Sequence, residues 1–362
     1  MAVSSSFWNG KKVLITGHTG FKGSWLTLWL HHMGAEVTGY ALEPKGEPNL
    51  FTEAGVGDIC LSVTGDVRNR GHLLETMLTA EPDIVIHMAA QPLVQYSYEY
   101  PVETFEVNVM GTVNVLEAVR QASELNGKLR AVLNVTTDKC YENQEWVWGY
   151  REHDRLGGYD PYSNSKACSE MVTAAYRSSY FNPDTYPAPL PVVATARAGN
   201  VIGGGDWSDN RIVPDCVRAL TGDDPLMLRN PAAIRPWQHV LEPLSGYLQL
   251  VQSMVTHGNT YGGAWNFGPN EDNERNVEWL VREMGRLWGK DNFYQVDTEA
   301  APHEALNLKL DSAKAKRHLG WSPRWDTLTG LKYTVEWYQA YQRHENMRQA
   351  CVDQIEAYMA AI

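Results

Sequence analysis

Residues 13–25 read Val13-Leu14-Ile15-Thr16-Gly17-His18-Thr19-Gly20-Phe21-Lys22-Gly23-Ser24-Trp25. The apolar run 13–15 predicts a buried parallel strand. Residues 24–30 predict a helix, whose expected buried face carries Leu26, Trp29, Leu30 and Met33. A strand, a glycine-rich turn and a helix in this order are typical of a dinucleotide-binding unit.

The turn has the spacing GxxGxxG, which is associated with proteins related to short-chain dehydrogenases. Glycine suits a tight turn that needs positive φ, and it lets a pyrophosphate approach the backbone at the helix N-terminus. The residues expected to contact the cofactor here are Gly17, Gly20, Phe21, Lys22 and Gly23, with the ammonium of Lys22 available to the pyrophosphate. The alternative is a plain structural turn.

Bulk composition excludes several classes of function. The chain has 362 residues and a net charge of −12, which disfavours nucleic acid as the main partner. No apolar run approaches the roughly 18 residues of a membrane span, and residues 1–12 lack the apolar stretch of a signal peptide. The five cysteines are scattered, so neither a disulfide framework nor a structural metal is expected. We expect a cytoplasmic protein.

Strand-like and helix-like segments alternate along the first 200 residues. Further strands are expected at 36–42, 59–64, 83–87, 131–136 and 192–197, and helices at 70–80 and 107–125. This alternation predicts an α/β fold with a Rossmann-like, doubly wound parallel sheet. Ligands bind beyond the carboxyl ends of such strands, so the functional residues should follow Ile15, Val63, Ile86, Val135 and Ala196.

The later part of the chain is less regular and richer in glycine and proline. We expect residues 1–180 to form the dinucleotide-binding domain, with 192–202 and about 264–268 returning to it. Residues from about 203 to 362 should form mostly a smaller, interleaved C-terminal lobe that binds the substrate.

Chemically active side chains follow the predicted strand at 131–136. Thr137, Asp138 and Lys139 come directly after it, and Tyr162 and Lys166 lie further along. Residues four apart share one helix face, so the tyrosine and this second lysine can enter one site. A nearby ammonium should lower the pKa of the phenol and make it an acid/base, and the same lysine can hydrogen-bond a nicotinamide ribose. A chance YxxxK is the alternative.

These motifs resemble the extended short-chain dehydrogenase/reductase family, which includes nucleotide-sugar epimerases and 4,6-dehydratases. The resemblance covers essentially the whole chain, including the closing segment 311–321. The stretches that narrow it to the 4,6-dehydratases are 17–25, 87–94, 137–141, 158–163, 197–207 and 234–240. It implies tightly held NAD, CDP-glucose as the substrate, and a role in making deoxysugars for bacterial surface polysaccharides.

The resemblance also implies residue roles. Tyr162 would take the proton of the sugar 4-hydroxyl, with Thr137 and Lys166 beside it; epimerases need only these three. Elimination of water requires a further acid and base, and we expect Asp138 and Lys139 to fill these roles. Better-known sugar dehydratases carry glutamate at the position of Lys139, and an ion pair at the strand end is the alternative.

The residues themselves leave the choice between NAD and NADP open. The acidic residue expected at the end of the second strand is replaced by Ala41, and Glu43 stands two residues beyond. Lys45 leaves NADP open, whereas the resemblance favours NAD. The adenine should meet Asp66 and Val67, and the cofactor should pass Ala89 and Ala90.

The substrate diphosphate is expected to bind Arg211 and Arg235, because planar guanidinium groups pair with phosphate oxygens, and Asn200. Surface salt bridges are the alternative for both arginines. A homodimer or larger homo-oligomer is expected through the helices near 107–125 and 166–179. Two other functions stay open at this point: a nucleotide-sugar 4-epimerase and a non-enzymatic NAD-binding regulatory protein.

Overall fold

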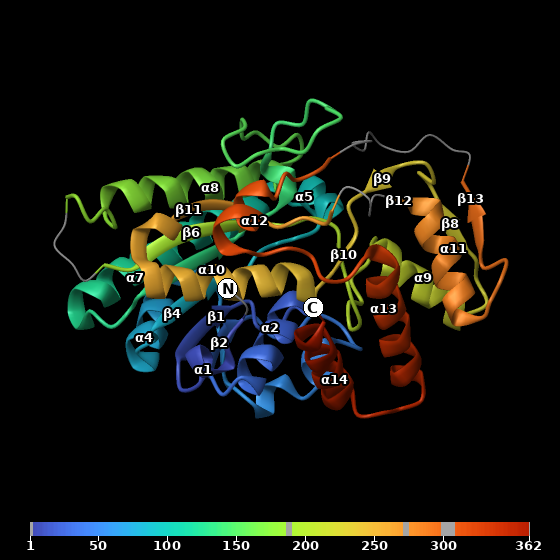
Figure 1. Ribbon diagram of the computed structural model, residues 1–362, viewed down its shortest axis with the longest axis horizontal. Helices are drawn as coiled ribbons and strands as arrows, with labels where there is room; N and C mark the ends of the chain where they lie inside the picture. The colour runs from blue at the N-terminus through green and yellow to red at the C-terminus, as the bar shows by residue number, and fades with distance from the viewer. Residues whose placement is uncertain (1–2, 186–189, 271–274, 298–307, 362) are drawn as a thin grey trace.

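A seven-stranded parallel sheet forms the centre of the computed structural model, which describes residues 3–185, 190–270, 275–297 and 308–361 (Figure 1). The strands are β1 (Lys12–Thr16), β2 (Glu36–Ala41), β3 (Leu61–Thr64), β4 (Ile84–His87), β5 (Ala131–Val135), β6 (Val192–Arg197) and β11 (Gly263–Asn266). They lie in the order β11-β6-β5-β4-β1-β2-β3, and each neighbouring pair is parallel. The predicted doubly wound α/β sheet is confirmed.

The strand order reverses between β1 and β4, which is where open α/β sheets bind ligands. Thr16 of β1 is paired with His87 of β4. Their side chains are also hydrogen-bonded, with 2.6 Å between the Thr16 Oγ1 and the His87 Nδ1. The loops that leave these two strands therefore begin side by side.

Helices cover both faces of the sheet, so its central strands are apolar throughout. On one face, Val13 and Ile15 pack with α2 (Phe21–His32) and α10 (Leu241–His257). On the other face, Leu14 packs with α4 (Arg70–Ala80) and α7 (Gly111–Asn126), and α8 (Pro161–Ser179) lies beside α7 (Figure 1).

Helix α2 differs from the single buried face that the sequence predicts. Trp25, Thr27 and Leu28 are buried as well as the expected face. The reason is that later segments cover the side of α2 that faces away from the sheet. The indole of Trp25 donates to the carbonyl of Gly204 at 2.9 Å, and Trp29 packs edge-on against Tyr358.

Several predicted boundaries shift, and two of the shifts have a local structural cause. Strand β3 begins at Leu61 rather than at residue 59, because residues 56–58 form a 3-10 turn that runs into Ile59. The helix expected from residue 107 opens with a π-helical turn, Glu106–Met110, before α7. In that turn, the Asn108 amide donates to the carbonyl of Gln91 and to the Ser165 hydroxyl.

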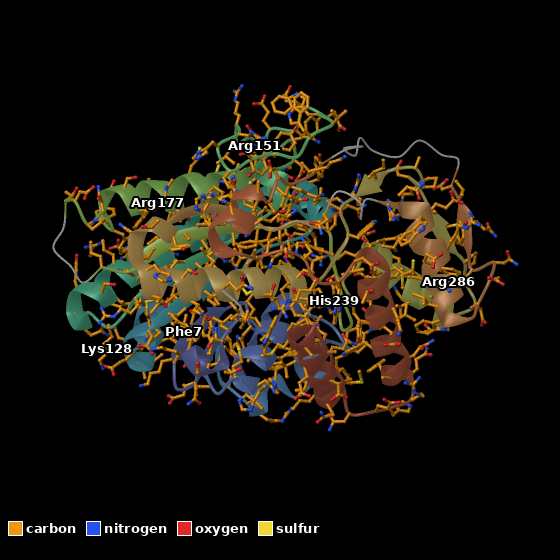
Figure 2. The ribbon with its side chains drawn as sticks, in the orientation of Figure 1. Phe7, Lys128, Arg151, Arg177, His239 and Arg286 are labelled. Atoms are coloured by element: carbon orange, nitrogen blue, oxygen red, sulfur yellow. The ribbon has the colours of Figure 1, made fainter. Side chains whose placement is uncertain are left out.

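The second half of the chain adds a lobe to one side of the sheet (Figure 1). It contains α9 (Ile212–Thr221) and α11 (Val277–Trp288), together with the paired strands β8 (Leu226–Leu228) with β13 (Tyr294–Val296) and β9 (Ile234–Arg235) with β12 (Arg275–Asn276). Lys128, after α7, and Arg286, on α11, lie toward opposite ends of the molecule (Figure 2).

The remaining elements are α1 (Ser5–Trp8), α3 (Leu50–Glu53), α5 (Val94–Glu99), α6 (Pro101–Phe105), β7 (Val201–Ile202), β10 (Gln238–His239), α12 (Ala313–Leu319), α13 (Thr327–Gln342) and α14 (Met347–Ala360). Strand β7 pairs with β10, and α14 returns to pack on α2. Among the helices described, none has the length and apolar character needed to cross a membrane.

Glu242, at the start of α10, is a buried carboxyl group that joins the C-terminal segment to the sheet. It accepts the backbone N–H groups of Arg324 and Trp325 and the hydroxyl of Tyr358 at 2.7–3.1 Å. Burial raises the pKa of Glu242 to about 7, and these hydrogen bonds offset only part of that shift.

The raised pKa of Glu242 predicts a pH-dependent stability. Between pH 4.5 and about 7 the folded state holds a proton that the unfolded state releases. The contribution of this group is therefore complete below the unfolded pKa and is lost as pH rises through about 7. The free energy of unfolding should fall by at most about 1.4 kcal/mol per pH unit in this window. Urea unfolding at several pH values should show a flatter dependence of the unfolding free energy on pH for Glu242→Gln than for the wild type. The control Glu356→Gln, at an exposed position, should keep the wild-type slope. An unchanged slope in Glu242→Gln would contradict the prediction.

Candidate active site

The glycine turn after β1 uses each glycine for a different reason. Gly17 has φ +82°, and a Cβ there would lie 2.7 Å from the backbone nitrogen of Ala89. A Cβ at Gly23 would strike the carbonyl oxygen of Gly17, so helix α2 can pack closely on the turn only with glycine at that position. A Cβ at the exposed Gly20 would meet only the Gly17 oxygen at 3.5 Å, an ordinary contact. Nothing described in the chain requires glycine at position 20, whereas a ligand lying against the backbone would.

The N-terminus of α2 is suited to an anion. Gly20 caps it without a side chain, and its first turn holds no acidic residue. Lys22 stands in that turn, half-buried, although a cation is unfavourable at a helix N-terminus. Burial, followed by the charge of Arg211, lowers the pKa of Lys22 to about 8, while Asp138 and Asp206 partly oppose this shift. A pyrophosphate here would offset both penalties, so the residues present fit a dinucleotide.

The other predicted cofactor residues follow β1, β3 and β4. The hydroxyl oxygen of Thr16 accepts the backbone N–H of Ala89 at 3.2 Å, which fixes the half-buried Ala89–Ala90 segment beside the glycine turn. The Asp66 carboxylate is held by the guanidinium of Arg68 at 2.6–3.1 Å. Val67 is buried next to Asp66. The ring of Phe21 lies near Gly203, where a Cβ would come within 3.1 Å of it.

A short 3-10 turn after β5 holds the predicted acid and base. Thr137 begins this turn and its hydroxyl donates to Asp138 Oδ1 at 3.0 Å. Asp138 Oδ2 is buried and has no hydrogen-bond partner among the residues described. Gly199 packs against this carboxylate so closely that any Cβ there would strike it. Lys139 is half-buried in the same turn.

Helix α8 brings the predicted tyrosine and lysine to this turn. Asp160 caps the helix by accepting the N–H of Ser163 at 2.9 Å, and Pro161 occupies its first position. Tyr162 and Lys166 follow one turn apart and are both buried. Tyr162 is hydrogen-bonded to Thr137. The Lys166 ammonium donates to the carbonyl of Val135 at 3.1 Å.

The electrostatics of this pair differ from the sequence prediction. A lowered pKa was expected for the phenol, but burial raises the pKa of Tyr162 to about 12, while the Thr137 hydrogen bond and the charge of Arg211 oppose the shift only in part. Burial also lowers the pKa of Lys166 to about 8. The cost of burying each charged form therefore exceeds the effect of the neighbouring groups.

A buried ion pair supports the end of β5. The carboxylate of Glu170, one turn after Lys166, accepts two guanidinium N–H groups of Arg197 at 2.8–2.9 Å. It also accepts the hydroxyls of Thr136 and Thr195. Thr136 directly precedes Thr137, so this pair fixes the strand from which the turn with Asp138 and Lys139 begins.

The three predicted substrate residues do not all meet at this turn. Arg211 is ion-paired with Asp206 at 2.9 Å, and its charge acts on both Tyr162 and Lys22. Asn200, at φ +45°, directly follows the Gly199 that packs on Asp138. Arg235 is buried on β9 in the second lobe, and its guanidinium donates to the carbonyl of Ile234 at 2.9 Å.

Sequence reasoning missed three supporting groups: Gly199, Asp206 and the Glu170–Arg197 pair. Glu170 stands four residues after Lys166, so helical spacing alone would have placed it near the site. The partner of Gly199, Asp138, lies far away in the sequence, and no local pattern identifies it. Asp206 stands only five residues before its partner Arg211, so local spacing could have suggested that ion pair.

Comparison with known proteins decides the family. The family model described as GDP-mannose 4,6 dehydratase matches residues 14–334. The chain belongs to this family. The sequence-based assignment to the nucleotide-sugar 4,6-dehydratases, which are hydro-lyases, is confirmed.

The dehydratase family includes a close relative of this chain. The CDP-glucose 4,6-dehydratase of Salmonella typhimurium is 50% identical over 359 residues, covering 99% of each chain. Among solved structures, the dTDP-glucose 4,6-dehydratase of Streptomyces venezuelae with NAD bound has a TM-score of 0.78 at 24% identity, covering 93% of this chain and 99% of its own. The UDP-glucose 4-epimerase of Thermotoga maritima has a TM-score of 0.78 at 20% identity, covering 91% and 99%. The last two similarities concern the fold.

Proposed function

We propose that this chain catalyses the NAD-dependent dehydration of CDP-glucose to CDP-4-dehydro-6-deoxyglucose and water. The observation that carries the proposal is the grouping of Thr137, Asp138, Tyr162 and Lys166 where β5 ends and α8 begins. The similarity to the Salmonella enzyme supports CDP-glucose. We further propose a cytoplasmic enzyme that serves deoxysugar synthesis for surface polysaccharides.

The cofactor site is proposed from the glycine turn. Gly17, Gly20, Phe21, Lys22 and Gly23 would hold the pyrophosphate of NAD. The adenine would lie at Asp66 and Val67, and the dinucleotide would pass Ala89 and Ala90. Bound NAD would accept a hydride from carbon 4 of the sugar and return it to carbon 6. The fit of a dinucleotide to α2 and the NAD-bound fold neighbours support this assignment.

Tyr162 is proposed to move the proton of the sugar 4-hydroxyl. At neutral pH its raised pKa keeps the phenol protonated in the chain as described. Thr137 hydrogen-bonds it, and the charge of Arg211 favours the phenolate. The Lys166 ammonium would also hold the nicotinamide ribose.

Asp138 and Lys139 are proposed to carry out the elimination. Once carbon 4 is a ketone, the proton at carbon 5 becomes acidic; Lys139 would remove it and Asp138 would protonate the departing 6-hydroxyl. The unpartnered, buried Asp138 Oδ2 supports this role, because a buried oxygen without a hydrogen bond is costly unless a ligand completes it. A 4-epimerase would have no use for either group.

The substrate lobe is proposed to follow the division expected from the sequence. Residues 1–180 with 192–202 and about 264–268 would hold NAD, and about 203–362 would hold mostly the nucleotide sugar. Within this lobe, α10 and α14 return to the sheet side. Arg211, Asn200 and Arg235 would bind the diphosphate.

Lys22→Gln is expected to weaken NAD binding about tenfold, because a charge-assisted hydrogen bond to a phosphate contributes roughly 1.5–3 kcal/mol. Isothermal titration would measure the affinity. Lys22→Arg should keep most of it, and Lys128→Gln, at an exposed ion pair with Glu81, serves as the matched control. Unchanged affinity in Lys22→Gln would show that Lys22 does not contact the cofactor.

The proposed function is tested by incubating the protein with NAD and with CDP-, UDP-, GDP- or dTDP-glucose in deuterated water. A product of CDP-glucose that has lost water and gained deuterium at carbon 5 supports the dehydratase. Inversion of the 4-hydroxyl without loss of mass would identify an epimerase. Binding of NAD without turnover of any sugar would leave a non-enzymatic NAD-binding protein.

Oligomerisation is proposed through the outer faces of α7 and α8. Two exposed apolar side chains on and beside α7, Met110 and Leu125, support a second copy there. Sedimentation at micromolar concentration should give a dimer or larger assembly, and a clean monomer would overturn the proposal.

A further inference from the structure

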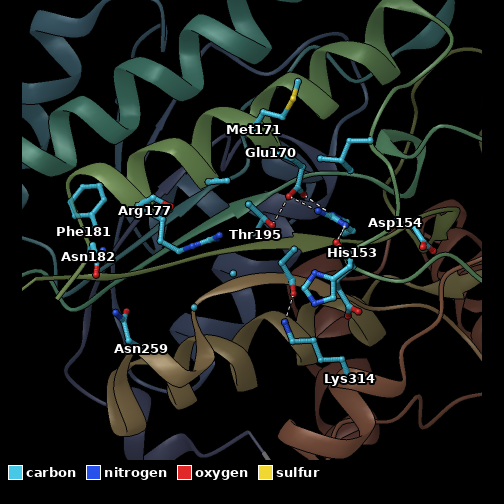
Figure 3. Close-up of a pocket in the computed structure, with 18 residues that line it drawn as sticks. His153, Asp154, Glu170, Met171, Arg177, Phe181, Asn182, Thr195, Asn259 and Lys314 are labelled. Atoms are coloured by element: carbon cyan, nitrogen blue, oxygen red, sulfur yellow. Dashed lines mark hydrogen bonds and ion pairs between the residues drawn. The ribbon is translucent and has the colours of Figure 1, made fainter. Parts of the chain in front are cut away.

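A cavity lies between α8, the edge strand β11 and the loop that precedes α8, apart from the turn that holds Thr137 and Asp138 (Figure 3). Its volume is about 700 Å³, within the range of small-molecule sites. It forms at the edge of the sheet, where Gly262 and Gly263 provide no side chains to fill the space beside α8. None of the residues proposed above for catalysis, cofactor or substrate lines this cavity.

Arg177 reaches from α8 into this cavity (Figure 3). Its guanidinium lies over Gly263, where a Cβ would be 3.8 Å from Nη1. Among the residues described, none forms a hydrogen bond or ion pair with this guanidinium. Burial lowers the pKa of Arg177, and the charge of Glu170 offsets part of that shift. A half-buried arginine without a partner is a favourable donor for an anionic ligand.

Lys314 enters the same cavity from the opposite side (Figure 3). Its ammonium lies 4.1 Å above the ring of Trp265 and donates to the carbonyl of Ala264 at 2.6 Å. This bond uses one of its three N–H donors. Burial lowers the pKa of Lys314, and the neighbouring charges of Arg197 and Arg177 lower it further. Three positively charged side chains, Arg177, Arg197 and Lys314, therefore lie close enough to repel one another.

The carboxylates around the cavity are engaged elsewhere. Glu170 is held by Arg197 through two hydrogen bonds. Glu152 accepts the backbone N–H of Asn266 at 3.0 Å. Its negative charge offsets only part of the lowering of the Lys314 pKa that burial causes. Asp154 accepts the backbone N–H of Arg151 at 2.7 Å. Arg177 and Lys314 thus lack a direct carboxylate partner among the residues described.

We propose that this cavity binds the phosphate group of a small organic phosphate, which pairs with Arg177 and Lys314 from opposite sides. A tetrahedral phosphate offers oxygens to a planar guanidinium and to an ammonium at the same time. Asn182, Asn259 and His153 also line the cavity and supply further donors. Met171 and Ala174 line it as well and provide apolar contact for the organic part of the ligand.

The site is close to the catalytic strand but independent of it. Glu170 lines the cavity and also accepts the hydroxyl of Thr136, the residue before Thr137. The Glu170–Arg197 ion pair therefore lies between the cavity and the end of β5. The inference does not depend on the proposed dehydratase activity, because its test measures binding alone.

The experiment is a calorimetric titration of the full-length protein with inorganic pyrophosphate, in the presence of saturating NAD and CDP so that the proposed active site is filled. One pyrophosphate per chain is expected to bind. Arg177→Gln and Lys314→Gln should each weaken its affinity about tenfold or more, because each removes a charge-assisted hydrogen bond.

Two further variants keep the test decisive. Lys314→Arg should retain binding even if Lys314→Gln unfolds, since it keeps the cation. Arg286→Gln changes an exposed arginine on α11, far from Arg177 in the molecule, and should leave the affinity unchanged (Figure 2). Absence of saturable binding, or equal affinity in the wild type and Arg177→Gln, would overturn the proposal.

Discussion

Replacing Tyr162 by phenylalanine is expected to lower kcat/KM for CDP-glucose by roughly 10³–10⁴-fold, the upper range for loss of a general acid/base. The phenol, which is hydrogen-bonded to Thr137, is the proposed acid/base group, and the variant keeps the ring but removes the hydroxyl that would carry the proton. Because the first oxidation cannot proceed, neither the dehydrated product nor the absorbance of reduced nicotinamide should appear. Product chromatography and absorbance under single-turnover conditions would measure both.

A matched control for this variant lies three residues earlier. Tyr159 is 85% exposed and precedes the helix, so Tyr159→Phe should keep nearly full activity. If Tyr162→Phe retained activity within tenfold of the wild type, another group would have to carry the proton. Tyr162→Phe should also leave the thermal unfolding midpoint near that of the wild type, because the ring still fills its buried position.

The sheet could be predicted from the sequence because its information is local. Strands β4 and β6 begin with the apolar runs 84–86 and 192–194, and α4 begins and ends where the predicted helix does. The glycine turn likewise combines strand, turn and helix within a few residues. Alternation along the chain then leaves few possible topologies for a parallel sheet.

Several properties of the site were beyond local sequence patterns because they come from tertiary contacts. The raised pKa of Tyr162 is set by how many groups surround the phenol, which YxxxK spacing does not reveal. The position of Asp138 depends on Gly199, which is distant in sequence and adjacent in space. Helix α2 is buried on more than the predicted face because Gly204 and Tyr358, both distant from it in sequence, approach it in the fold.

Replacing Lys139 by alanine is expected to separate the two halves of the reaction. In the proposed mechanism, oxidation at carbon 4 would use Tyr162, Thr137 and Lys166, all of which the variant keeps. Removal of the carbon 5 proton should slow by roughly 10²–10³-fold, since a positioned base contributes about that much. Reduced nicotinamide should therefore accumulate in a single turnover while release of the dehydrated product falls, and rapid-quench mass spectrometry would follow both.

Deuterated water distinguishes the roles of Lys139 and its neighbour. If Lys139 is the base, Lys139→Ala should lose deuterium incorporation at carbon 5. Asp138→Asn keeps nearly the same shape against Gly199 but cannot protonate the leaving hydroxyl, so it should retain exchange at carbon 5 while water loss slows. The reverse pattern would exchange the two assignments. Normal water loss in Lys139→Ala would instead mean that Lys139 has a structural role at the end of β5. The base would then be another group near Asp138.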